Sequence, residues 1–130
     1  MCREPESPPP PPQPQQSLTI TQWNTRGLIS HWAEFKQAAH TLNTDILCVQ
    51  ETHLRPSDPY TLNIHPFTLI RTDCQIQTNN RMGGVATYVK HNIPHKQIQL
   101  DTQADIQAIE LFLNNQHITL INCYASPSRA

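Results

Sequence analysis

Three polar residues of different chemistry, Asn24, Glu51 and Tyr124, each stand at the end of a run of apolar or β-branched residues. A carboxylate such as that of Glu51 can bind Mg²⁺, which takes one or two protein carboxylates and keeps waters and phosphate oxygens as further ligands. The Asn24 amide could hold that carboxylate in place, and the Tyr124 hydroxyl could donate a hydrogen bond to a phosphate oxygen. Polar residues at strand ends also simply cap strands and bind water, so the spacing alone does not name a reaction.

The segments that must position Asn24 and Glu51 form a predicted strand-helix-strand unit. Residues 18–23 alternate in polarity and are rich in β-branched residues, which indicates a strand. Apolar residues recur at helical spacing over residues 30–43, and residues 45–50 form the apolar run of a strand covered on both faces. The two strands should be parallel with a right-handed crossover, which places the backbones of Asn24 and Glu51 about 5 Å apart if the strands are neighbours. Ligand sites of open α/β sheets lie at this end of the strands.

The rest of the chain is predicted to form further strands. Residues 67–71 and 83–89 have strand-like patterns, and the second begins with two glycines, which indicates a close approach of the backbone to another group. Residues 106–113 and 118–123 are typical of a hairpin, because the two asparagines between them tolerate the positive φ angles of a tight turn.

Size and composition limit the chain to one domain with a lean core. It has 130 residues, of which 37% are hydrophobic and 6% aromatic. The formal net charge of −1 gives no general attraction to nucleic acid, which usually binds strongly basic domains. Four cations and one anion lie between Arg71 and Lys96, which leaves two interpretations open: a strip that faces phosphate groups, or a solvated surface.

The first 17 residues are rich in proline and glutamine, and we expect them to be a disordered leader that serves as a linker. We assign residues 18–130 to one partial domain. The four cysteines have no CxxC spacing and are expected to be reduced thiols. Because the sequence shows no signal peptide and no apolar stretch of transmembrane length, we expect an intracellular protein without a membrane partner.

None of the histidines is predicted to be catalytic. His91 and His95 have the spacing of one helix face, but Pro94 would break such a helix, and no further ligand is spaced to close a zinc site. His31 and His40 fall on the predicted helix, where we expect them at its surface.

Four motifs in a fixed order give the chain a resemblance to a known family. They are Asn24-x-Arg26-Gly27-Leu28, Asp45-Ile46-Leu47-Cys48-Val49-Gln50-Glu51-Thr52-His53-Leu54, Arg81-x-Gly83-Gly84-Val85-Ala86 and Asn122-Cys123-Tyr124-Ala125-Ser126-Pro127. Together they resemble the endonuclease domain of non-LTR retrotransposons, of the LINE-like and jockey-like kinds. That domain is an apurinic-endonuclease-like branch of the endonuclease/exonuclease/phosphatase superfamily.

The resemblance implies a fold and roles for individual residues. The fold would be α/β: the N-terminal half of a four-layer α/β sandwich of the DNase I-like type, with a mixed sheet and a β-α-β start. Glu51 would bind the divalent metal, Mg²⁺ or Mn²⁺, with Asn24 beside it, and Tyr124 would contact the scissile phosphate of DNA. Arg26 and Arg81 are the weaker candidates, for contacts with phosphate.

Two further motifs of that family, Asp-x-Asn and Asp-His, do not occur in the 130 residues. The resemblance implies that they activate the water and stabilise the leaving group. The favoured interpretation is an N-terminal fragment of a metal-dependent DNA endonuclease, inactive by itself and nuclear when functional, that nicks target DNA to prime reverse transcription. The alternatives are a non-catalytic remnant that binds DNA or a partner weakly, and a phosphatase branch of the superfamily.

The resemblance also implies two sheets packed face to face. A chain that supplies mainly the first sheet would leave its inner face uncovered. Because exposed apolar area of that size promotes association, we expect the chain to self-associate through this face.

Overall fold

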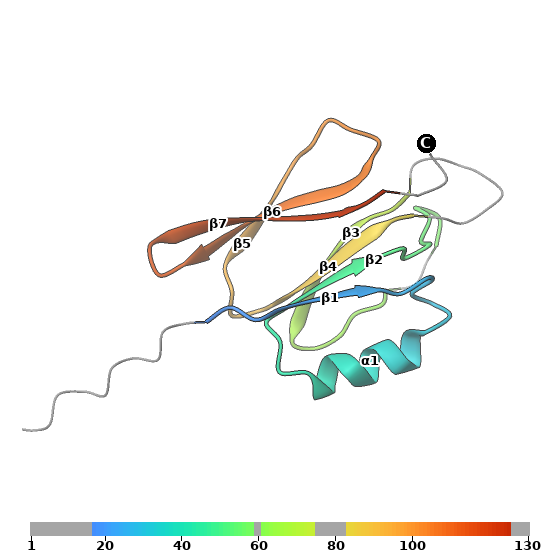
Figure 1. Ribbon diagram of the computed structural model, residues 1–130, viewed down its shortest axis with the longest axis horizontal. Coiled ribbons are helices and arrows are strands. Elements are labelled where there is room, and N and C mark those ends of the chain that lie inside the picture. Colours follow the sequence, from blue (N-terminus) through green and yellow to red (C-terminus); the bar gives the residue numbers. More distant parts are fainter. Residues whose placement is uncertain (1–16, 59–60, 75–82, 126–130) are drawn as a thin grey trace, which may run out of the picture.

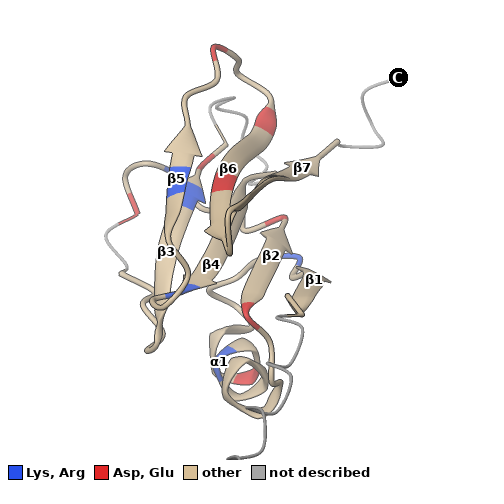
Figure 2. Ribbon diagram, turned by 90° about the vertical axis from the view of Figure 1, so that its left-hand side faces the viewer, with Lys and Arg blue, Asp and Glu red and all other residues tan. Residues whose placement is uncertain are grey.

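The structure of the chain is a computed structural model that describes residues 17–58, 61–74 and 83–125. Its helix and strands are, in chain order, β1 (Ile20–Asn24), α1 (Trp32–Thr41), β2 (Ile46–Gln50), β3 (Phe67–Thr72), β4 (Val85–Lys90), β5 (His95–Ile98), β6 (Asp105–Leu113) and β7 (Gln116–Tyr124). They form three layers, namely the helix, a four-stranded sheet and a three-stranded sheet (Figure 1, Figure 2). The predicted α/β fold of a partial sandwich is thereby confirmed. All but the last residue of the Pro/Gln-rich leader lies outside the described residues.

The first sheet has the strand order β1-β2-β4-β3 and contains the predicted β-α-β unit. β1 and β2 are parallel, with Asn24 opposite Gln50, whereas β4 is antiparallel to both β2 and β3, so the sheet is mixed. All five residues of β2 are buried, as its apolar run predicts for a strand covered on both faces. Helix α1 is two residues shorter at each end than the predicted range of 30–43.

Phe35 lies at the centre of the core between helix α1 and the first sheet. Its ring centroid is 5.4 Å from that of Tyr88 on β4 and 5.5 Å from that of Trp23 on β1. Phe35 and Tyr88 have no exposed surface, and the Tyr88 hydroxyl donates a hydrogen bond to the carbonyl of Leu62 at 2.8 Å. The buried face of β1 is therefore the face of Trp23, and Ile20 on the other face is exposed.

The second sheet, with the order β5-β6-β7, covers β2, β3 and β4 on the inner face of the first sheet. The apolar side chains buried between the two sheets are Ile46, Cys48, Val89, Ile93, Ile109 and Leu111. This finding corrects the expectation of an open inner face for β2, β3 and β4, because the chain supplies strands to both sheets. Most of the surface through which self-association was expected is therefore buried, whereas Ile20 on β1 remains exposed.

The predicted hairpin of the second sheet is confirmed. β6 and β7 pair in antiparallel fashion along their whole lengths. Asn114 and Asn115 connect them with φ angles of 43° and 62°, the positive values that a two-residue hairpin turn needs. The sequence does not predict β5, because this strand is short and polar, and it is defined by its pairing with β6 rather than by a pattern of its own.

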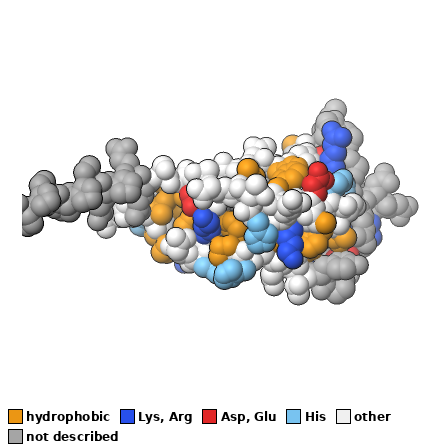
Figure 3. Space-filling view, turned by 90° about the horizontal axis from the view of Figure 1, so that it is seen from below, with side chains coloured by type: hydrophobic (Ala, Val, Ile, Leu, Met, Phe, Trp, Pro, Cys, Tyr) orange, Lys and Arg blue, Asp and Glu red, His pale blue; other side chains and the backbone are white. Residues whose placement is uncertain are grey.

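The surface on the side of helix α1 has a mixed character. Hydrophobic, basic and histidine side chains are interspersed on it rather than gathered by type (Figure 3). Among the described residues, this face therefore presents no continuous basic surface of the kind that non-specific binding of nucleic acid requires. In the described part of the chain, no helix is long and apolar enough to cross a membrane.

Cysteine labelling tests the core between the sheets. Burial raises the pKa of the Cys48 thiol to about 11, although a hydrogen bond with Thr87 acts in the opposite direction. Cys123 is exposed on β7. Because the thiolate is the reactive form, we expect iodoacetamide at pH 8 to modify Cys48 at least about tenfold more slowly than Cys123 in the folded chain. Peptide mapping by mass spectrometry measures both rates. In urea the chain is unfolded and the two rates should become similar. Equal rates of modification in the folded chain would contradict the packing of the two sheets.

Candidate cation and phosphate site

The structure brings Asn24, Glu51 and Tyr124 together at one end of the two sheets. Asn24 is the last residue of β1, Glu51 follows β2, and Tyr124 is the last residue of β7. The Tyr124 hydroxyl donates a hydrogen bond to the Glu51 carboxylate. The site is therefore built from both sheets, and it depends on how the second sheet lies over the first.

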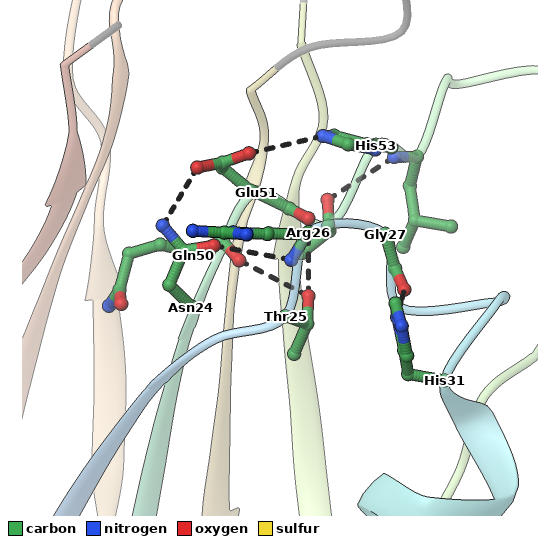
Figure 4. Close-up of polar contacts among 10 residues, drawn as sticks. Asn24, Thr25, Arg26, Gly27, His31, Gln50, Glu51 and His53 are labelled. Carbon is green, nitrogen blue, oxygen red and sulfur yellow. Dashed lines mark hydrogen bonds and ion pairs between the residues drawn. The ribbon is translucent and has the colours of Figure 1, made fainter. Parts of the chain in front are cut away.

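The side-chain amide of Asn24 has a fixed orientation. Its Nδ2 donates to Glu51 Oε1 at 2.8 Å, and its Oδ1 accepts from the backbone N–H of Arg26 at 3.2 Å (Figure 4). Since both ends of the amide are bonded, Asn24 holds one oxygen of the carboxylate and leaves Oε2 directed elsewhere. The contact places Asn24 beside Glu51, and its supporting role in cation binding stays a prediction.

The chain makes an unusual turn at residues 51–53. Glu51 and His53 both have left-handed backbone conformations, with φ angles of 52° and 57°. Such a conformation costs roughly 1–3 kcal/mol for a residue with a side chain, so surrounding contacts must impose it. The loop after β1 provides two of these contacts, because Gly27 N donates to Glu51 O at 2.7 Å and Leu28 N donates to Thr52 O at 3.0 Å.

The glycine pair before β4 holds the other side of this turn. The carbonyls of Gly84 and Gly83 accept the N–H groups of Thr52 and His53 at 3.2 and 2.9 Å. A Cβ atom at Gly84 would collide with the Thr52 hydroxyl, and one at Gly83 would collide with the Asp105 carboxylate. The predicted close approach of the backbone is thereby confirmed, and the group approached is the turn that carries Glu51.

His53 is a member of the site that the sequence interpretation missed. Its Nε2 lies 3.4 Å from Glu51 Oε2, the oxygen that Asn24 does not hold (Figure 4). The only signal in the sequence is its position two residues after Glu51, within the most specific motif.

The Glu51 carboxyl is ionised at neutral pH. Partial burial by itself raises its pKa, but the hydrogen bonds from Asn24 and Tyr124 and the contact with His53 outweigh that effect. The pKa of Glu51 is therefore lowered from its ordinary value. A negatively charged oxygen is thus available to a cation at the surface of the site.

A network of buried polar side chains, called here the inter-sheet network, lies directly behind the site. Its members are Gln50 on β2, Thr87 on β4, Gln107 on β6 and Asn122 on β7. Gln50 Nε2 donates to Asn122 Oδ1 at 2.8 Å, Asn122 Nδ2 donates to Thr87 Oγ1 at 3.1 Å, and Thr87 Oγ1 donates to Gln107 Oε1 at 2.6 Å. The network therefore ties the two sheets together one residue from Glu51 and two residues from Tyr124.

The sequence profile of the endonuclease/exonuclease/phosphatase family matches residues 21–124, which is most of the chain. The chain belongs to the endonuclease/exonuclease/phosphatase family. The superfamily that the four motifs resemble is thus confirmed. No curated protein sequence is similar enough to the chain to count as a match.

Three solved structures have the same fold as this family member. The AP endonuclease LMAP from Leishmania major is 16% identical with a TM-score of 0.66, and covers 84% of this chain and 40% of its own. The endonuclease domain of TRAS1, a telomere-specific non-LTR retrotransposon, is 22% identical with a TM-score of 0.65. This match covers 87% of the present chain and 48% of the TRAS1 domain. The catalytic domain of Xenopus laevis APE2 is 19% identical with a TM-score of 0.64. This match covers 86% of the present chain and 47% of the APE2 domain. The chain therefore spans less than half the length of each of these structures.

Of the two arginines that the resemblance named, only one lies within the described residues. Arg26 is exposed beside Asn24, with a left-handed backbone at φ 49° (Figure 4). Its side chain therefore lies at the surface of the site. Arg81 lies outside the described residues.

The basic strip between Arg71 and Lys96 is partly neutralised. Arg71 Nη2 lies 2.8 Å from the Asp73 carboxylate, and Lys90 Nζ lies 3.7 Å from that of Asp45. Both pairs make these cations less available to phosphate, and both are largely buried, so they support neither a strip that faces phosphate nor a fully solvated surface.

The donor atoms at the site fit a divalent cation that keeps most of its own waters. They comprise one ionised carboxylate, which the Asn24 amide holds in place, and one imidazole. No group of three or more His, Cys, Asp or Glu residues that could hold a metal occurs in the described ranges. Mg²⁺ and Mn²⁺ are bound in this way, through one or two protein ligands completed by water and phosphate oxygens. The Nε2 atom of His53 supports the fit, because this buried nitrogen lies 3.4 Å from Glu51 Oε2, a separation at which both atoms could reach one cation.

Proposed function

We propose that this chain carries the cation-binding and phosphate-binding part of a divalent-metal-dependent DNA endonuclease domain. The observation that supports the proposal is the convergence of Asn24, Glu51 and Tyr124 from the ends of three strands in two sheets. The solved structures that share its fold include an AP endonuclease and the endonuclease domain of a retrotransposon. The reaction would be hydrolysis of a phosphodiester bond.

Each side chain would have a separate task in binding the DNA phosphate. Glu51 would hold the divalent cation through Oε2, and Asn24 would keep the carboxylate in position through the 2.8 Å hydrogen bond to Oε1. Tyr124 would donate a hydrogen bond from its hydroxyl to a phosphate oxygen when DNA displaces its hydrogen bond to Glu51. A bound cation supplies charge stabilisation to the phosphoryl oxygens.

The biological task that we propose is the nicking of target DNA by a non-LTR retrotransposon. It rests on the four sequence motifs and on the fold shared with the TRAS1 domain. Acting on chromosomal DNA, the protein would work in the nucleus and would be encoded together with a reverse transcriptase.

A DNA-binding experiment tests the proposal. We expect Mg²⁺ or Mn²⁺ to increase the affinity of the 130-residue chain for a short DNA duplex about fivefold or more, because a cation held by Glu51 would supply positive charge for the DNA phosphate. Removal of the metal with EDTA and the substitution Glu51→Gln should each abolish the increase. Fluorescence anisotropy of labelled DNA measures the affinity at fixed ionic strength. The matched control is Glu34→Gln, which changes the net charge equally at an exposed helix position.

A second measurement separates binding from cleavage. Because Asp-x-Asn and Asp-His are absent from the 130 residues, we expect this chain to leave a supercoiled plasmid intact in the presence of Mg²⁺. Nicking that Glu51→Gln abolishes would show that these motifs are not needed for the reaction. A DNA affinity that changes neither on addition of the cation nor on the substitution Glu51→Gln would contradict the proposed site.

A further inference from the structure

His53 differs from the other histidines whose ring contacts are defined in the described structure. His31 and His95 each place Nδ1 within hydrogen-bond distance of a backbone carbonyl, and His117 contacts Glu110 at the surface. The Nε2 atom of His53 is buried and lies 3.4 Å from Glu51 Oε2, where it forms an ion pair with the carboxylate when the imidazole is protonated. At 3.4 Å a neutral imidazole makes only a weak hydrogen bond, so a closer partner placed between the two atoms would stabilise this buried nitrogen.

The ring of His53 is held where it is by the fold. The backbone N–H of His53 is bonded to Gly83, and the left-handed conformations of Glu51 and His53 fix the course of the chain that carries both side chains. On the opposite edge of the ring, Nδ1 rests against Gly27, where an added Cβ would lie only 3.3 Å away. The imidazole therefore lies against the loop after β1, with Nε2 directed at the carboxylate, while the glycine pair holds the backbone of His53.

We infer that His53 Nε2 is a nitrogen ligand of the same cation that Glu51 Oε2 binds, so that the site prefers Mn²⁺ to Mg²⁺. The inference rests on the proposed cation-binding function of Glu51. Two donor atoms on one cation, each about 2.1 Å from it, are separated by roughly 3.0–3.4 Å, which agrees with the distance between Nε2 and Oε2. A cation between these atoms would also satisfy the lone pair of the buried nitrogen.

The choice of ion follows from the chemistry of the donors. Mg²⁺ is a hard cation that prefers oxygen ligands, whereas imidazole suits transition-metal ions, and Mn²⁺ accepts both kinds of donor. An all-oxygen site would discriminate less between the two ions. The imidazole of His53 is thus the group that sets the preference.

Titration calorimetry and electron spin resonance on the full 130-residue chain, without DNA, test the inference. We expect His53→Asn to weaken Mn²⁺ binding about tenfold or more, and to change Mg²⁺ binding less than about twofold. Asparagine tolerates the positive φ angle at this position, so the turn should be kept, and circular dichroism verifies the fold. The spin echo of bound Mn²⁺ should show modulation from a coordinated nitrogen that disappears in His53→Asn. His40→Ala, on the exposed side of helix α1, should change neither quantity.

Each other outcome has a definite meaning. If His53 is only an ion-pair partner of Glu51, its removal leaves Mn²⁺ binding unchanged or strengthens it, and the inference is wrong. Nitrogen modulation that persists in His53→Asn would also show that His53 is not the nitrogen ligand and that the inference is wrong. Absence of Mn²⁺ and Mg²⁺ binding by the unsubstituted chain would instead overturn the cation site of the proposed function itself.

Discussion

Replacing Phe35 with alanine should lower the free energy of unfolding by about 4 kcal/mol. The side chain is fully buried and touches three aromatic rings, with centroid distances of 5.5 Å to Trp23, 6.1 Å to Trp32 and 5.4 Å to Tyr88. Alanine would leave a cavity that these rigid rings cannot fill by small movements, so the transfer and cavity costs add. A loss of this size is a large part of the total stability of a small domain.

Urea unfolding measures the effect of the Phe35 substitution. The fluorescence of Trp23 and Trp32 reports it directly, because both rings border the cavity. Phe35→Leu keeps most of the volume and should cost less than half as much, and Gln37→Ala on the exposed face of the same helix should change stability by less than about 0.5 kcal/mol. A loss below about 1 kcal/mol for Phe35→Ala would mean that helix α1 does not pack on the first sheet as described.

Local patterns were sufficient to predict the first sheet and the hairpin. The helical spacing of Trp32, Phe35 and Ala39 and the apolar run of β2 each reflect burial that repeats with the period of the element. The positive φ angles of Asn114 and Asn115 are a property of the residue type, so the turn between β6 and β7 could also be predicted. Sequence reasoning works here because neighbouring residues carry the signal.

The features that the sequence did not predict depend on residues far apart in the chain. β5 exists because Lys96 and Gln97 pair with Glu110 and Ile109 of β6, which no pattern within a four-residue polar strand reveals. The second sheet covers the first because two apolar faces meet, and this contact joins residues such as Ile46 and Leu111. Partners at such separations cannot be read from periodicity.

The candidate site shows the same division. Asn24, Glu51 and Tyr124 could be named because each stands at a strand end within a motif, and the structure places them together. The role of His53 could not be derived from the motif, because it depends on the left-handed turn at residues 51–53 and on the glycines that hold it. The inter-sheet network was equally hidden, since Gln50 and Asn122 are 72 positions apart.

Replacing Asn122 with alanine should lower the free energy of unfolding by about 3 kcal/mol. Its Oδ1 accepts from Gln50, and its Nδ2 donates to the carbonyl of Ala86 at 2.9 Å and to Thr87 Oγ1 at 3.1 Å. Alanine would leave the Gln50 amide, whose Oε1 already has no hydrogen-bond partner, with an unpaired buried donor as well. Thermal or urea unfolding followed by circular dichroism measures the loss.

The Asn122 substitution should also weaken cation binding, although Asn122 does not touch the cation site. Asn122 and Tyr124 point to the same side of β7, so a looser contact between the sheets moves the Tyr124 hydroxyl away from Glu51. The matched control is Cys123→Ala, because the side chain between them on β7 is exposed and should change stability by less than about 0.5 kcal/mol. If Asn122→Ala is destabilised but binds Mn²⁺ as the unsubstituted chain does, the network only stabilises the fold. A joint loss of stability and affinity, absent in Cys123→Ala, would mean that these buried amides position the site.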